Sequence, residues 1–273
     1  MERCPRPKLP AGWYQVCVGK ALKKGASRRV DYLGRGFTLS RSDNGVVSIA
    51  EVTSSGRRLI PPEHVHEANG IIFLYFDLAG REPTWRVPVI PEYGQKGWSG
   101  WINFHWIVKT HIQELMENAV DKGHFPTVHK YFKAPNVNTF TWNGPTFNFN
   151  MDAPHKVFGS VQNNNLDLTA FALSLVMVKV TTRTLTLRVC DTVTPIDDDY
   201  VQLNTSVIFK KRNPLYDAAI RIALPFEVKR YITSDHPILE AKGYYDRPVL
   251  CAEDGPIMKL RSWAQQFYPP TEA

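Results

Sequence analysis

Residues 114–131, ELMENAVDKGHFPTVHKY, carry the pattern on which the interpretation of this chain depends. They overlap the segment 111–125, whose apolar residues recur with the period of an amphipathic helix. On such a helix Glu117, Asp121 and His124 fall on one stripe. Asp121 can then accept a hydrogen bond from one imidazole nitrogen of His124 and leave the other nitrogen free for a metal ion. The alternative is an ordinary helix end, at which water and Asp121 satisfy the histidine.

A second histidine, His129, lies five residues after His124. Since a helix turns by about 100° per residue, the two side chains would point about 140° apart on an unbroken helix. Pro126 lacks a backbone N–H and its ring crowds the preceding turn, so it predicts an interruption between the histidines. The interruption would let both imidazoles reach one ion. Two histidines at this spacing are a weak metal signal alone, and the nearby aspartate and proline strengthen it.

Composition bounds the fold class and the partners. A chain of 273 residues with 43% hydrophobic content can bury the core of one large domain or two modest ones. The formal charge is +7 and the pI about 9.2, but the densest basic stretches, 20–29 and 210–212, are short and lack interleaved aromatics. An ordinary solvated surface is the favoured interpretation and a docking site for an acidic protein is the alternative. Nucleic acid is not expected as a partner.

Cysteine usage and hydropathy indicate a cytoplasmic protein. No secretory signal precedes the cysteines, and the longest apolar run, 171–180, is too short to cross a bilayer, so no membrane association is expected. We expect reduced, packed thiols at four widely separated positions that form no C-x-x-C pair: Cys4, Cys17, Cys190 and Cys251.

The distribution of strand and helix patterns predicts an α+β arrangement. Residues 11–90 alternate apolar with polar residues as short strands, and a Pro- and Gly-rich loop, 87–100, follows them. We therefore expect one domain over residues 1–98 and a second over residues 99–273. Strand patterns return from 138 to 211, and one of them, LTAFALSLVMVKVTT, reads as a single strand. A helical region from about 214 to 242 contains two prolines, so the second half is an antiparallel sheet with flanking helices.

The segment ENAVDKGHFPTVH resembles the iron-binding segment of the Rieske non-haem iron oxygenases. That pattern runs Asn, two residues, Asp, two residues, His, four residues, His, and it falls on Asn118, Asp121, His124 and His129. The tail from ITSDHPILEAKG to QQFYPP resembles the branch that contains the 3-ketosteroid hydroxylase oxygenase components. This second resemblance implies that Asp235 is the third iron ligand. From the residues alone, Asp235 is either a helix N-cap, a surface residue or the group that completes the metal site.

The resemblance implies a helix-grip-like catalytic domain that binds Fe(II) through His124, His129 and Asp235. Two histidines and one carboxylate on one face of an ion form the facial triad of Fe(II) oxygenases. Asn118 is implied as a polar neighbour of the iron that does not bind it. Asp121 is implied as the bridge between a ligating histidine and the cluster of a neighbouring subunit, in a trimer. We expect apolar and aromatic cavity walls from two segments, 171–178 and 139–142.

The cluster that the resemblance implies has no ligands in this sequence. A Rieske [2Fe–2S] cluster needs C-x-H and C-x-x-H, and no cysteine here is followed by histidine at either spacing. The flanking sequences nevertheless resemble the opening and closing strands of a Rieske domain, with only VTSSGRR between them. We therefore expect a cluster-less remnant of a Rieske-type β domain. Electrons would come from a separate ferredoxin-type or reductase protein, or from a cluster-containing paralogue in a mixed trimer.

Three functions follow as alternatives. The first is a mononuclear Fe(II) oxygenase that hydroxylates, demethylates or desaturates a small apolar organic molecule with O2. The second is a non-catalytic or accessory subunit of a hetero-oligomeric oxygenase. The third is a redox-neutral enzyme that uses the metal as a Lewis acid. No glycine-rich phosphate loop follows a strand, so neither NAD nor flavin is expected as a cofactor.

Overall fold

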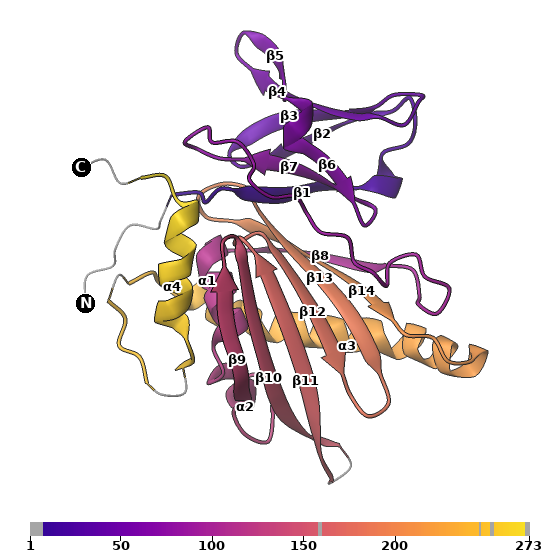
Figure 1. Ribbon diagram of the computed structural model, residues 1–273, viewed down its shortest axis with the longest axis vertical. Coiled ribbons are helices and arrows are strands. Elements are labelled where there is room, and N and C mark those ends of the chain that lie inside the picture. The colour runs from indigo at the N-terminus through magenta and orange to yellow at the C-terminus, as the bar shows by residue number, and fades with distance from the viewer. Residues whose placement is uncertain (1–7, 158–159, 246, 252–253, 271–273) are drawn as a thin grey trace.

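The N-terminal part of the chain forms two small antiparallel sheets (Figure 1). The computed structural model describes residues 8–157, 160–245, 247–251 and 254–270. The three-stranded sheet has the order β1 (Gly12–Val18), β7 (Ile71–Phe76) and β6 (Val65–Ala68). The four-stranded sheet follows chain order: β2 (Ser27–Tyr32), β3 (Arg35–Arg41), β4 (Val47–Thr53) and β5 (Gly56–Leu59). Short 3-10 helices occupy Gly19–Ala21, Pro62–His64 and Gln265–Phe267.

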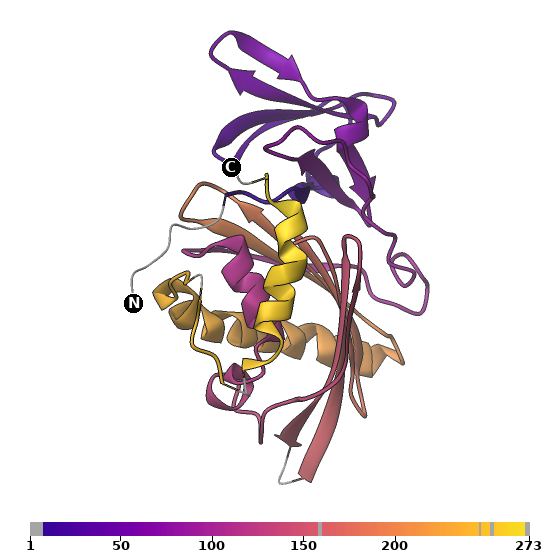
Figure 2. The same cartoon turned by 60° about the vertical axis from the view of Figure 1, so that its left-hand side comes forward.

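A seven-stranded antiparallel sheet forms the second half of the molecule. Its spatial order is β8 (Ile102–Val108), β14 (Val201–Phe209), β13 (Thr186–Pro195), β12 (Leu175–Thr181), β11 (Ser160–Phe171), β10 (Thr146–Val157) and β9 (Asn136–Asn143). The helices are α1 (Ile112–Val120), α2 (His124–Thr127), α3 (Pro214–Ala241) and α4 (Ile257–Ala264). Figure 2 shows α1, α3 and α4 on one face of this sheet. No helix among the described residues is both long and apolar enough to cross a lipid bilayer.

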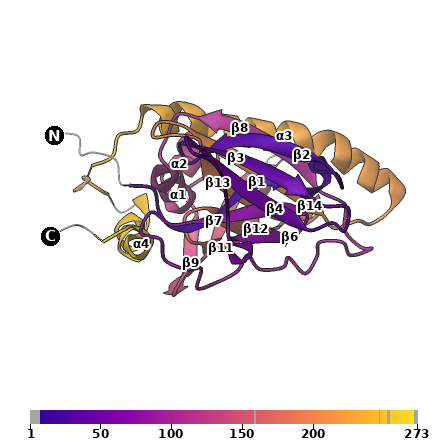
Figure 3. The same cartoon turned by 90° about the horizontal axis from the view of Figure 1, so that it is seen from above.

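The two halves meet where β1 packs on β13 and on the β11–β12 turn (Figure 3). The Ser174 hydroxyl donates to the Trp13 carbonyl over 2.8 Å. The side chain of Gln15 accepts from Thr192 over 2.7 Å, and its backbone carbonyl accepts from Thr194 over 2.8 Å. These groups are buried, so their hydrogen bonds replace contacts with water that folding removes. The expected boundary at 98/99 lies in the loop between β7 and β8, and this division of the chain stays a prediction.

The β11–β12 turn corrects the expectation of a single strand over LTAFALSLVMVKVTT. The run folds back on itself, and Ala172 adopts a φ of 49°, which is unusual for a residue with a Cβ. Tertiary contacts hold the turn: the Ala172 N–H donates to the Pro145 carbonyl over 2.9 Å, and Leu173 is fully buried. Ser174 is the one common turn residue in it, so the local sequence carries only a weak signal for the turn.

Helix α4 is fixed to α1 and to the sheet. The indole of Trp263 lies 5.2 Å from the ring of Phe147, and its N–H donates to the Gly144 carbonyl over 2.9 Å. The Arg261 guanidinium donates two hydrogen bonds to the buried Glu117 carboxylate, 2.8 Å from Nε to Oε1 and 3.0 Å from Nη2 to Oε2. Bidentate pairs of this kind fix orientation as well as contributing energy.

The sequence predicts structural ion pairs that anchor the last helix from four residues of the tail: Asp246, Arg247, Asp254 and Arg261. Arg261 does anchor the last helix, with Glu117 as its partner. Asp254 instead accepts from the Cys251 backbone N–H over 2.6 Å. Asp246 lies outside the described residues. Glu117, which seemed to belong to the metal-binding stripe, is therefore a structural residue.

Gly255, which precedes α4, lets the backbone at this point lie close to the last residue of α1. Gly255 has a φ of +69°, and a Cβ there would lie 2.4 Å from the Val120 carbonyl oxygen. We expect Gly255→Ala to lower the free energy of unfolding by about 1–3 kcal/mol, because backbone must move to admit the methyl group. Denaturant unfolding measures the loss. Gly144→Ala is the matched control, with a φ of +50° and no neighbour within 4 Å, and an equal loss there would contradict the steric explanation.

Candidate metal centre

The helix expected over residues 111–125 ends earlier than its apolar period predicts. Helix α1 begins after the N-cap His111 and ends at Val120, and the following Asp121 is extended, with a ψ of 116°. The Asp121 carboxylate accepts from the Gly123 N–H over 2.8 Å and so stabilises the turn. The break therefore precedes His124, and the stripe that would join Asp121 to His124 on one helix does not form.

Pro126 does not cause the interruption, contrary to expectation. It lies in the first turn of α2, where the N–H groups lack an intrahelical partner and a missing one costs little. His124 is the first residue of α2, and His129 follows its last turn, where its N–H donates to the Phe125 carbonyl over 3.1 Å. The two imidazole centroids are 4.9 Å apart. One short helical turn thus directs both histidines to the same place.

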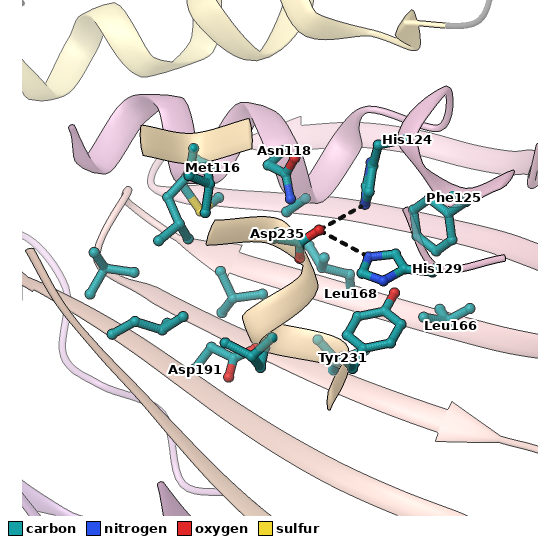
Figure 4. Close-up of a pocket in the computed structure, with 18 of the residues that line it drawn as sticks. Met116, Asn118, His124, Phe125, His129, Leu166, Leu168, Asp191, Tyr231 and Asp235 are labelled. Carbon is teal, nitrogen blue, oxygen red and sulfur yellow. Dashed lines mark ion pairs between the residues drawn. The ribbon is translucent and has the colours of Figure 1, made fainter. Parts of the chain in front are cut away.

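Helix α3 supplies the carboxylate. Asp235 lies in the last two turns of α3 and is 8% exposed, so it is neither an N-cap nor a surface residue. Its Oδ1 is 3.2 Å from Nε2 of His129 and 4.0 Å from Nε2 of His124 (Figure 4). One ligand atom from each of the three residues lies within 4.8 Å of the others. Among the described residues no other group of three His, Cys, Asp or Glu is so arranged.

Ser234 determines which nitrogen of His129 carries the proton. The Ser234 hydroxyl donates to the Tyr231 carbonyl over 2.7 Å and lies 3.2 Å from Nδ1 of His129. Since the hydroxyl proton is used by the carbonyl, the oxygen accepts from Nδ1–H. Nε2 of His129 is then unprotonated, and its lone pair faces Asp235. Tyr231 holds the same ring by stacking on it, with centroids 3.7 Å apart and planes 6° apart.

These atoms fit a metal ion. Nε2 of His129 and Oδ1 of Asp235 are buried, and neither has a hydrogen-bond partner in the described part of the chain. Two facing electron pairs in a buried site repel each other unless a cation or a proton lies between them. Metal bonds to imidazole nitrogen and carboxylate oxygen are about 2.0–2.2 Å long, so ligand atoms of one ion lie up to about 4.2 Å apart. The separations of 3.2 and 4.0 Å from Asp235 satisfy that limit.

Asp121 and Asn118 lie beside this group. Nδ1 of His124 is 3.7 Å from Oδ2 of Asp121, so the imidazole points toward the carboxylate, but the expected hydrogen bond is not formed. Asn118 projects from α1, is half-buried and lines the same cavity as the histidines. Both residues are therefore close to the site, and neither contributes to the converging atoms.

The three residues border a cavity of about 150 Å³ between the helices and the large sheet. Val176 and Val178 line it, as expected of the segment 171–178. The segment 139–142 does not line it, because Phe140 packs on Phe147 instead. Two lining residues, Tyr231 and Asp191, were not anticipated from the sequence. Tyr231 lies one helical turn before Asp235, which is the only local signal for it.

Comparison with known families identifies a family for most of the chain. Residues 74–268 match the family described as the 3-ketosteroid 9alpha-hydroxylase C-terminal domain. The chain belongs to this family. The matched range includes the three converging residues as well as Asn118 and Asp121.

Two curated relatives indicate the range of the family. A probable 3-ketosteroid-9-alpha-monooxygenase, oxygenase component, of Rhodococcus rhodochrous is 28% identical over 228 residues, covering 76% of this chain and 57% of that protein. A cholesterol 7-desaturase of Ciona intestinalis is 22% identical over 337 residues, covering 96% of this chain and 73% of that protein. The chain therefore spans little more than half the length of the first relative.

Two solved structures share the fold. Dicamba monooxygenase bound to dicamba has a TM-score of 0.72 at 14% identity, covering 94% of this chain and 96% of that one. Pseudomonas putida CBB5 NdmB has a TM-score of 0.69 at 15% identity, covering 95% and 93%. These likenesses confirm the expected architecture of antiparallel sheets with a few helices. The idea that the N-terminal sheets are a cluster-less remnant stays a prediction.

Proposed function

We propose that this chain is a mononuclear non-haem Fe(II) oxygenase that acts on a small apolar organic molecule. The observation that carries the proposal is the buried convergence of His124, His129 and Asp235 at the edge of an apolar cavity. Two imidazoles and one carboxylate suit Fe(II) and leave positions open for other ligands. The relatives support the chemistry, because they are named as a monooxygenase component and a desaturase.

The substrate is proposed to be a steroid or a molecule of similar shape. The curated relatives are named for 3-ketosteroids and for cholesterol, and the cavity beside the metal centre is lined mostly by Leu, Val, Met and Phe. In a hydroxylation, one C–H bond, O2, two electrons and two protons give one C–OH bond and one water. In a desaturation, the same O2, electrons and protons remove two hydrogens and give two waters.

Some residues of this chain would bind the iron, and others would orient the His129 ring and the substrate. Iron, when bound, supplies the site at which O2 is activated. His124, His129 and Asp235 would hold it, and Ser234 and Tyr231 would keep the His129 ring in place through its Nδ1–H and its face. Apolar walls would exclude water and orient the substrate.

The electrons are proposed to come from another protein. The strands β4 and β5 are joined by a two-residue turn, because Thr53 pairs with Gly56, at the place where the resemblance expects cluster-bearing loops. Among the described cysteines, Cys17 and Cys190 are buried and Cys251 is exposed, and none forms a disulfide; Cys4 lies outside the described residues. A ferredoxin-type donor that docks on a homotrimer, or a cluster-containing paralogue within a hetero-trimer, would deliver electrons near Asp121.

The test is product analysis with isotopically labelled O2. The iron-loaded chain, an androstane steroid and a chemical reductant are expected to give a product that contains one labelled oxygen, or one that has lost two hydrogens. Product that forms without O2 or reductant would contradict the proposal and favour the redox-neutral enzyme. No product from an iron-loaded, reduced chain would favour the accessory subunit.

Ser234 gives a prediction that needs no turnover. We expect Ser234→Ala to weaken Fe(II) binding by about 10- to 100-fold, because the His129 ring loses the acceptor that fixes its tautomer. Competition with a chelator of known affinity measures the change. Ser262→Ala is the control, since Ser262 is exposed and its hydroxyl donates to the Met258 carbonyl within α4, 3.0 Å away. Unchanged affinity in Ser234→Ala would contradict the role given to this hydroxyl.

A further inference from the structure

A second cavity continues the first along α3. Its volume is about 390 Å³, within the range of about 300–1,000 Å³ that is usual for small-molecule sites. Six residues line both cavities, so the two cavities are neighbours: His129, Leu166, Val178, Asp191, Tyr231 and Ile232. The metal centre borders the smaller cavity. The larger cavity therefore suits the end of a substrate that lies away from the reacting carbon.

The walls of the larger cavity are mostly apolar, and its polar lining residues are His129, Tyr131, Asn164, Asp191, Thr205, Glu227, Arg230 and Tyr231. Glu227 and Arg230 are exposed and pair with each other over 2.7 Å, so they mark the mouth. Asp191 lies deeper, in the middle strand β13, and takes part in both cavities. A carboxyl group in such a wall is costly unless a partner satisfies it.

Asp191 has one partner and one free oxygen in the described part of the chain. It pairs across the sheet with Thr205 of β14, whose hydroxyl donates to Oδ1 over 2.6 Å. No further hydrogen bond to this carboxyl is present among the described residues. Burial raises the pKa of Asp191 to about 6, and the bond from Thr205 opposes that rise. At pH 8 the group is therefore a carboxylate, which accepts hydrogen bonds and donates none.

We infer that Asp191 selects an alcohol over the corresponding ketone, by accepting a hydrogen bond from a hydroxyl on the substrate end that fills the larger cavity. The inference rests on the proposed function and narrows its substrate class. A ketone oxygen offers only lone pairs to the carboxylate, and the Thr205 proton is already used by Oδ1. A site built to bind a hydroxyl rejects the analogue that lacks it, since its buried polar group is then left unpaired.

The test compares two steroids that differ at one carbon, androstanol and its ketone androstanone. Binding to the iron-loaded chain is measured at pH 8 by calorimetry, without O2 or an electron donor, and iron content is measured in the same sample. We expect androstanol to bind at least about tenfold more tightly than androstanone. This comparison needs no variant, so it stands even where a substitution unfolds the chain. Equal binding, tighter binding of the ketone or binding of neither steroid to an iron-loaded chain would overturn the inference and leave the metal site intact.

A variant then assigns the preference to one carboxyl. Asp191→Asn keeps the shape and adds a donor, so the ratio of the two affinities is expected to fall to within about threefold. Asp167→Asn is the matched control, on the exposed face of β11 opposite Lys179, and is expected to keep the wild-type ratio. An unchanged ratio in Asp191→Asn would overturn the assignment. Absence of iron from the wild type would instead count against the proposed function itself.

Discussion

His129→Ala is expected to abolish tight iron binding, reducing about one Fe(II) per chain to a trace after gel filtration. The imidazole is buried, stacked on Tyr231 and held through Nδ1, so no neighbouring side chain can replace it. Asp235→Asn is expected to behave in the same way, because the amide keeps the volume and loses the charge that balances the ion. Elemental analysis after anaerobic reconstitution measures the iron.

A histidine outside the site provides the control. His105 lies on β8 and is exposed, and His105→Ala is expected to keep the wild-type iron content. Circular dichroism and unfolding curves establish that the His129→Ala chain is folded. A folded His129→Ala or Asp235→Asn chain that still holds one iron would contradict the assignment of these ligands.

Glu117→Gln is expected to destabilise the fold by about 3–5 kcal/mol, because it removes the buried negative charge that accepts two hydrogen bonds from the Arg261 guanidinium. The Glu117 side chain is 1% exposed and that of Arg261 10%, so water cannot replace the lost carboxylate. Lys242 lies 3.8 Å from the same carboxylate and loses this ion pair too. Denaturant unfolding measures the change in free energy.

Two further variants separate charge from shape. Glu227→Gln removes the partner of Arg230 in an exposed pair and is expected to cost only about 0–1 kcal/mol. The double variant Glu117→Leu with Arg261→Met removes both buried charges and is expected to recover most of the loss. A change below about 1 kcal/mol in Glu117→Gln would show that the pair does not fix α4 to α1.

The long helix, the strands of the large sheet and the meeting of the two histidines could be predicted from the sequence. The helix expected over 214–242 is observed as α3, and the strand patterns of the second half form one antiparallel sheet. The local pattern around His124 and His129 correctly indicated that these side chains meet. The predicted cause of the helix break was wrong, because the extended backbone of Asp121 breaks the helix and Pro126 does not. The turn is made by Asp121 and Gly123, which are common turn residues, but the apolar period of 111–125 favoured a helix that continued through them.

Residues that act through long-range contacts could not be found in this way. Ser234 and Tyr231 touch His129 only because α3 crosses α2, and Asp191 meets the cavity because its register on β13 turns it inward. Glu117 shows the opposite error. Its helical spacing suggested that it belongs to the metal site. Its carboxylate instead accepts hydrogen bonds from Arg261, which lies far along the chain. Residue spacing predicts which side chains share a face of one helix or strand. The roles of these residues depend on contacts between two helices or strands.

We propose an iron site in a chain that carries no cluster of its own. The most direct measurement is the ratio of iron to acid-labile sulfide per chain, on protein reconstituted anaerobically with both Fe(II) and sulfide. We expect about one iron and no sulfide. About three irons with two sulfides would contradict the claim that the cluster is missing, and no iron at all would contradict the site built from His124, His129 and Asp235.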